Sequence, residues 1–258
     1  MPRGTWDEAT SVRPEAGSAG AGDTGAEASP DTWDEEHRLP RITHVIFDLD
    51  GTLLDTEPSY VAVIAEIAAR FGREYGPEVR RQMMGRPGAV AARIFVEALG
   101  LPITPEEFIA ARDARLEGMV RDCPPMPGAR ELSRHLHAHG IPQAIATSSS
   151  RRTLDYKTAA HADWLTIFGA IVTSDDVARG KPAPDIFLHA AGLIGAPPET
   201  TLVFEDAPLG VEAALAAGMH VVAIPEDVHR DRVAAAHLVL ESLEAFDPAA
   251  WGLPPLAR

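Results

Sequence analysis

Short continuous runs of apolar residues recur along the chain from residue 43 onward. Each run has between three and eight residues, a length that suits a strand buried on both faces of a parallel sheet better than a helix. Six strands are predicted in this way, over residues 43–50, 141–148, 170–174, 202–205, 221–224 and 238–240.

Helical periodicity fills most of the segments between these runs. It predicts helices over residues 128–139, about 150–160, 184–194 and 208–217, and Gly140 and Gly218 stand where helices commonly end. Because strands alternate with helices, we expect an α/β fold with a Rossmann-like, doubly wound parallel sheet.

One interval, residues 58–125, breaks this alternation. It contains no strand pattern but four helical ones, over residues 58–71, 76–84, 88–99 and 105–120. Active sites of open parallel sheets lie at the carboxyl ends of the strands. A helical insert after the first strand is therefore expected to form a cap over that edge, on a core made of residues 41–57 and 126–258.

The first 40 residues differ from the rest in composition. They carry nine acidic residues against three arginines and almost no apolar periodicity, so we expect a disordered acidic arm. The segment is neither rich in arginine, as organelle transit peptides are, nor apolar, as the core of a secretory signal is.

Charge and cysteine content narrow the class of protein further. The 258 residues include 38 acidic and 23 basic side chains, a net charge of −15, which argues against a nucleic-acid polymer or an anionic membrane as partner. The single cysteine, Cys123, excludes an intrachain disulfide and favours a reducing compartment. We expect a cytoplasmic protein, a monomer or weak dimer.

Acidic residues end two of the predicted strands. Asp48 and Asp50 are two residues apart in an extended segment, so they project to the same side, and Gly51 then allows a tight turn. Glu205 and Asp206 end a later strand. Adjacent buried carboxylates repel one another, and a hard divalent cation such as Mg²⁺ relieves that repulsion.

Hydroxyl groups and a lysine follow other strand ends. Thr147 and Ser148 end the second predicted strand, before a helix whose first N–H groups attract anions. Lys181 lies in a proline-rich loop and is one of only two lysines in the chain. Each feature alone has an ordinary explanation, as a turn, a helix cap or a surface charge. Their joint placement at strand ends indicates a functional site.

This ordered set of residues resembles the haloacid-dehalogenase superfamily of phosphohydrolases over about residues 43–242. The resemblance implies that Asp48 is the nucleophile of a two-step phosphoryl transfer and Asp50 the general acid and base. It further implies that Thr147 holds phosphoryl oxygens with Ser148 beside it, and that Lys181 offsets negative charge. Mg²⁺ would bind the Asp48 carboxylate, the Asp50 carbonyl and Asp206. Glu205 would bind Mg²⁺ either directly or through a water or another ligand.

Scaffold segments resemble the pseudouridine-5′-phosphatase branch of that superfamily, among them Met126–Ala129 and Phe204–Pro208. The resemblance implies a small phosphorylated metabolite as substrate, with pseudouridine 5′-phosphate favoured. In the cap, Glu57, Gly85 and Arg86 are the residues expected to reach the leaving group.

Other functions are compatible with parts of this sequence pattern. A sugar-phosphate or flavin-mononucleotide phosphatase would use the same core. A β-phosphoglucomutase-like enzyme would too, but such mutases commonly have a histidine early in the first cap helix, where this chain has Tyr60. A phospho-accepting receiver domain lacks an acid equivalent to Asp50 and has no helical insert.

Three histidines, His135, His137 and His139, lie close together at the end of a predicted helix. Positive charge there interacts favourably with the helix dipole, and we prefer this explanation to a zinc site.

Overall fold

The computed structural model describes residues 41–83, 86, 88–121 and 123–256. The predicted acidic arm, residues 1–40, lies outside these residues, and so does Gly85.

A six-stranded parallel sheet with the strand order β3-β2-β1-β4-β5-β6 forms the core, which confirms the predicted fold class. The chain leaves β1 at the centre, moves outward through β2 and β3, and then returns to the other side for β4 to β6. The strands are β1 (His44–Phe47), β2 (Gln143–Ala146), β3 (Ala170–Val172), β4 (Thr201–Glu205), β5 (His220–Ala223) and β6 (Leu238–Val239).

Alternate residues of the central strands enter two different apolar clusters, because successive side chains of a strand point to opposite faces. Val45 and Phe47 pack on one face with residues of α5 (Ala129–Ala138), while Ile46 packs on the other with residues of α8 (Asp185–Ile194) and α9 (Pro208–Ala216). Both faces of the sheet are therefore covered, as the continuous apolar runs predict. The remaining core helices are α6 (Arg151–Lys157) and α7 (Ala162–Leu165).

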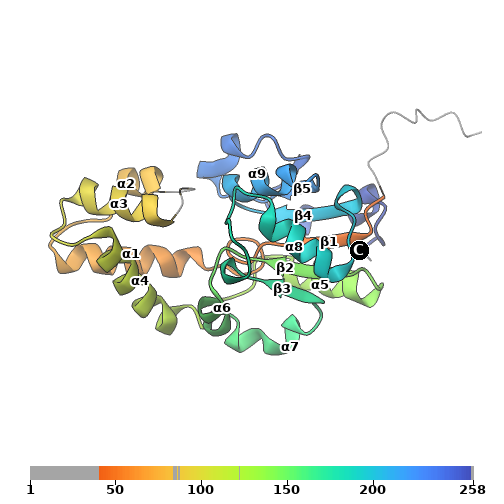
Figure 1. The fold of residues 1–258 in the computed structure, drawn as a ribbon, viewed down its shortest axis with the longest axis horizontal. Helices are drawn as coiled ribbons and strands as arrows, with labels where there is room; N and C mark the ends of the chain where they lie inside the picture. The colour runs from red at the N-terminus through yellow and green to blue at the C-terminus, as the bar shows by residue number, and fades with distance from the viewer. Residues whose placement is uncertain (1–40, 84–85, 87, 122, 257–258) are drawn as a thin grey trace, which may run out of the picture. The chain divides into compact units, whose positions relative to one another are not determined.

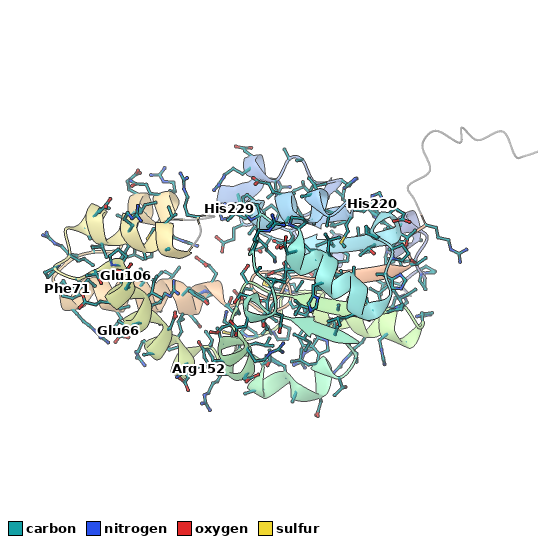
Figure 2. All side chains as sticks on the ribbon, viewed as in Figure 1. Glu66, Phe71, Glu106, Arg152, His220 and His229 are labelled. Atoms are coloured by element: carbon teal, nitrogen blue, oxygen red, sulfur yellow. The ribbon has the colours of Figure 1, made fainter. Side chains whose placement is uncertain are left out.

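Of the five α-helices described between β1 and β2 in sequence, the first four gather apart from the sheet (Figure 1). They are α1 (Glu57–Arg70), α2 (Pro77–Met83), α3 (Gly88–Leu99) and α4 (Pro105–Met119). They share a separate apolar cluster around Phe95 and Phe108, and Glu66 on α1 accepts a bond from Arg115 on α4 at 2.8 Å (Figure 2). We refer to these four helices as the cap.

Several contacts join the cap to the sheet domain. Arg152 on α6 donates to Glu117 on α4 at 2.9 Å (Figure 2), and Arg80 on α2 donates to Glu226, after β5, at 3.1 Å. Within the described part of the chain, no helix is both long and apolar enough to cross a membrane.

Candidate active site

The side chain of Lys181 lies between two carboxylates at the carboxyl edge of the sheet. Its Nζ donates to Asp48 Oδ1 at 2.5 Å, to Glu205 Oε1 at 2.7 Å and to the Ala146 carbonyl at 3.1 Å. Burial alone would lower the pKa of Lys181, but the charges of Asp48 and Glu205 outweigh burial and raise it. The ammonium is therefore held in its charged form directly beside the expected nucleophile.

Asp48 directly follows β1, is only 6% exposed and sits among more negative than positive charge. Burial, helped by Glu205 and Asp50 and opposed by Lys181, raises the pKa of Asp48 to about 7. Burial, helped by Glu205, Asp48 and Asp50 and opposed by Lys181, also raises the pKa of Asp206 well above its ordinary value. Three carboxylates, of Asp48, Glu205 and Asp206, therefore lie near one ammonium group, so negative charge exceeds positive charge in this part of the site.

The surplus of buried carboxylate oxygen fits a hard divalent cation. The Asp206 carboxylate packs directly against Gly51, since a Cβ at that glycine would overlap it, and this brings Asp206 next to the Asp50 backbone. In the described part of the chain, no three His, Cys, Asp or Glu side chains surround a common metal position. Mg²⁺ needs fewer protein side chains than that, because it keeps several waters and accepts backbone carbonyls.

Both carboxylate oxygens of Glu205 already have partners. Oε1 accepts from Lys181 and Oε2 accepts from the Ala207 N–H at 2.9 Å. The carboxylate is 1% exposed and packs against Gly210, in the first turn of α9. This arrangement holds Glu205 in place to orient Lys181.

The second aspartate, Asp50, accepts hydrogen bonds on both oxygens. Thr56 donates to Oδ1 at 2.8 Å, Lys157 to Oδ1 at 2.5 Å and Ser149 to Oδ2 at 3.0 Å. Burial favours a higher pKa for Asp50, but the charge and hydrogen bond of Lys157, together with Thr56 and Ser149, lower it. In this arrangement Asp50 is held as a carboxylate, the form of a general base.

Lys157 is the residue that sequence reasoning missed. It is fully buried at the end of α6 and donates to Asp50, to Tyr60 on α1 and to Ser149. A signal was available, because Lys157 and Lys181 are the only lysines of the chain and both lie at this site. No spacing rule, however, places a residue in this helix beside a carboxylate 107 positions earlier.

Hydroxyl residues after β2 complete the site. Thr147 is fully buried, and its Oγ1 accepts from the Ser149 N–H at 3.0 Å. Ser150 precedes α6 and caps it by accepting from the Thr153 N–H at 3.2 Å. The turn from strand to helix is thereby fixed, with Ser148 facing the neighbouring cavities.

Two cavities meet at these residues. One, of about 410 Å³, is bordered by Asp48, Lys181 and Arg86. The other, of about 510 Å³, is bordered by residues of the cap and of the sheet domain: Glu57, Tyr60, Arg112, Ser149, Ser150, Thr153 and His229. Asp50, Ser148 and Asp206 border both cavities. The predicted site residues that the structure describes border these cavities, except Thr147, which is fully buried and borders neither. Glu57 is also paired with Arg80 at 3.0 Å.

Comparisons with known proteins identify the family to which the chain is similar. A family model of haloacid dehalogenase-like hydrolases matches residues 42–218. The chain is 43% identical to a probable pseudouridine-5′-phosphatase of Drosophila melanogaster, over 84% of this chain and 96% of that protein. It is 44% identical to (DL)-glycerol-3-phosphatase 2 of Arabidopsis thaliana, over 83% and 92%. A structure of a Deinococcus radiodurans hydrolase of this family, with bound phosphate and sodium, matches with a TM-score of 0.69 and 27% identity, over 84% of this chain and 99% of that one.

Proposed function

Because the chain belongs to the haloacid dehalogenase-like hydrolases and is a phosphoric monoester hydrolase, we propose that it cleaves small phosphomonoesters through an aspartyl phosphate on Asp48. The observation that carries this proposal is the placement of Asp48 and Asp50. Asp48 borders only the smaller of the two cavities described, against Lys181, whereas Asp50 borders both. A phosphate in the smaller cavity and a leaving group in the larger one would meet at Asp50.

The two steps follow from these positions. A carboxylate oxygen of Asp48 attacks phosphorus, the bond from phosphorus to the ester oxygen breaks, and the leaving oxygen takes the proton that Asp50 received from water in the preceding turnover. Water then attacks the aspartyl phosphate and gives its proton to Asp50, and the bond from phosphorus to Asp48 breaks, releasing phosphate. General acid and base catalysis of this kind contributes roughly 10²–10⁴-fold to rate.

Asp48, Asp206 and the Asp50 carbonyl are the groups that we propose hold Mg²⁺, which when bound would offset the negative charge of the carboxylates and the phosphoryl oxygens. Lys181 supplies further positive charge beside Asp48. Thr147 and Ser148 orient the phosphoryl group. Both carboxylate oxygens of Glu205 already accept hydrogen bonds, so we propose that Glu205 orients Lys181 and does not bind the metal directly.

The favoured substrate is pseudouridine 5′-phosphate. The relatives named above are nearly equal in identity but differ in the substrate that their names give, so ancestry supports a class of substrate more firmly than one compound. The larger cavity has polar borders in Tyr60, Arg112 and Thr153 and a volume within the range of small-molecule sites. Sugar phosphates and flavin mononucleotide are the alternatives, and a cytoplasmic monomer or weak dimer stays a prediction.

A panel of phosphorylated nucleosides, sugars, glycerol 3-phosphate and flavin mononucleotide, compared by kcat/KM with Mg²⁺, tests the proposal. We expect pseudouridine 5′-phosphate to rank first and Asp48→Asn to abolish turnover of every ester while the circular dichroism spectrum is unchanged. Another ester ranking first would replace the substrate and leave the mechanism. Mg²⁺-dependent turnover retained by Asp48→Asn would overturn the mechanism.

A further inference from the structure

The buried ammonium of Lys157 has an arrangement that packing alone does not explain. We propose that Lys157 is a positioning residue, which fixes the orientation of the Asp50 side chain so that, when Asp50 carries a proton, it can pass that proton to the leaving group. This inference rests on the proposed phosphatase function. Lys157 is not among the residues that border either cavity, so its effect on the reaction must pass through the side chains that it bonds. Asp50 is the one of these with a chemical role in the proposed reaction.

All three donors of the Lys157 ammonium have partners. They go to Asp50 Oδ1 at 2.5 Å, to the Tyr60 hydroxyl at 3.0 Å and to Ser149 Oγ at 3.0 Å. Ser149 in turn donates to Asp50 Oδ2 at 3.0 Å. Lys157 therefore constrains one oxygen of Asp50 directly and the other through Ser149, which fixes the plane of the carboxylate.

Stability alone gives little reason for a lysine here. Lys157 is fully buried, and taking an ammonium out of water costs so much that an apolar side chain of similar volume in place of a buried ion pair is often neutral or stabilising. The partners of the ammonium also come from three separate segments: the end of β1, the turn after β2 and the first cap helix. A side chain with three fixed bonds across these segments is suited to setting the direction of one carboxylate.

The proposal has a consequence that depends on the leaving group. An alkyl ester needs a proton from Asp50 as its bond to phosphorus breaks, whereas 4-nitrophenyl phosphate releases a stabilised anion and does not. Loss of Lys157 should therefore lower kcat/KM much more for an alkyl ester than for the aryl ester. The value of kcat/KM covers the reaction only through formation of the aspartyl phosphate, so it excludes the later role of Asp50 as a base.

The test compares Lys157→Met with Asp50→Asn and with Thr158→Val in the full-length chain. Thr158 is the next residue, also buried, and its hydroxyl bonds only the Leu154 carbonyl at 2.8 Å, so it is a matched structural control. Each variant is assayed with 4-nitrophenyl phosphate and with the best alkyl phosphate of the panel. For Lys157→Met we expect the ratio of alkyl to aryl kcat/KM to fall about tenfold or more, in the direction of Asp50→Asn and within the span of acid catalysis. For Thr158→Val the ratio should not change.

A second pair of measurements keeps the test decisive if Lys157→Met folds poorly. Tyr60→Phe removes one partner of the ammonium and keeps its pair with Asp50, and we expect a smaller fall in the same ratio. In Lys157→Ala, ethylammonium chloride should raise alkyl-ester turnover above that in sodium chloride of equal ionic strength. Equal losses on both esters in every Lys157 variant, with no rescue, would overturn the positioning role. Failure of the wild-type protein to hydrolyse either ester would instead overturn the proposed function.

Discussion

The use of lysine at Lys181, in a chain whose other basic residues are almost all arginine, follows from the space between Asp48 and Glu205. An ammonium is a compact point charge that can donate in three directions, whereas a guanidinium is planar and donates in a fixed fork. Lys181 is 6% exposed and donates to Asp48, Glu205 and the Ala146 carbonyl at once. These acceptors do not lie side by side like the two oxygens of one carboxylate.

We therefore expect Lys181→Arg to fail as a conservative change. The larger group would displace Asp48 or Glu205, and kcat/KM should fall by about 10² or more, comparable with the loss of one electrostatic donor from an active site. Arg179→Lys is the matched exchange in the same loop, since Arg179 is 70% exposed and pairs with Asp185. Its free energy of unfolding should stay within about 0.5 kcal/mol of wild type, as for other surface substitutions, and its kcat/KM should be unchanged. Wild-type activity in Lys181→Arg would show that charge suffices without geometry.

At the scale of the element, the first turn of α9 contains a glycine that leaves room for a side chain of the active site. Gly210 lies in its first turn, and the Glu205 carboxylate occupies the space where a Cβ would stand. Glycine is a poor helix former, which costs about 1 kcal/mol relative to alanine in a helix interior. The absence of a side chain lets the strand end and the helix start approach closely enough to fix Glu205.

Gly210→Ala and Gly192→Ala should therefore have opposite effects. Gly192 lies on the exposed side of α8 with open space around it, so alanine there should raise the free energy of unfolding by about 0.5–1 kcal/mol and leave activity unchanged. At Gly210 the added methyl group must displace Glu205, so we expect a loss of about 1–3 kcal/mol together with lower kcat/KM. Urea unfolding and phosphatase assays measure both. Stabilisation by Gly210→Ala would contradict the packing argument.

The short segment after β3 gives a prediction about acid stability. Asp176 Oδ2 accepts from the Thr173 N–H and hydroxyl, both at 2.7 Å, and these bonds, with Arg151, lower the pKa of Asp176 below its ordinary value of 3.8. A carboxyl with a lower pKa in the folded state stabilises the fold above its unfolded pKa, and this contribution disappears as the pH falls through the folded value. Asp176→Asn should therefore lower stability at pH 7, and the difference from wild type should shrink in acid.

Urea unfolding between pH 7 and pH 3 measures this difference. Asp163→Asn is the control, because Asp163 is exposed and accepts from Thr166 through its backbone carbonyl. Its effect on stability should be small at every pH. A difference for Asp176→Asn that stays constant across the range would mean that the carboxylate form contributes nothing to the fold.

Elements with a strong pattern could be predicted from the sequence, and elements held by distant contacts could not. Each of the six predicted strands has an observed counterpart, although β1 and β2 are shorter than their apolar runs because pairing with neighbours ends sooner. The single turn of α7 had no signal in periodicity. It is fixed by Trp164, which is buried and donates to Ser133, 31 residues earlier in the chain.

On the scale of the whole molecule, the same division applies to the site. Asp48, Thr147 and Asp206 could be placed together from the sequence, because parallel strands bring their carboxyl ends to one edge. Lys157 and Arg112 could not, since their positions depend on how α6 and α4 pack against the rest. The charged residues of the site come from distant parts of the chain. The structure shows which carboxylates each lysine pairs with, and these pairs determine the balance of charge in the site.

That balance leads to a prediction about the stability of the whole protein. Asp48 and Glu205 are buried, and the half-buried Asp206 lies close to them. Among the described residues, Lys181 is the cation paired with Asp48 and Glu205, so the three carboxylates repel one another in the absence of a bound cation. A cation that binds the folded state alone stabilises it by about 2.7 kcal/mol at a hundred times its Kd. For a chain of this size, that corresponds to a rise in Tm of roughly 5–10 °C.

Mg²⁺ should therefore raise the Tm of the wild-type protein over that in EDTA, and Asp206→Asn should separate the two contributions to this rise. Removing one of the repelling charges should make the variant more stable than wild type in EDTA, while removing a proposed ligand should abolish the gain from Mg²⁺. Asp175→Asn is the control. Asp175 follows β3, and its carboxylate accepts from the Arg151 N–H, so this variant should keep the full rise in Tm with Mg²⁺. Thermal melts with and without Mg²⁺ measure both quantities. If Asp206→Asn kept the wild-type gain, Asp206 would not be a magnesium ligand, and if it were less stable in EDTA, the carboxylate would stabilise the fold by itself.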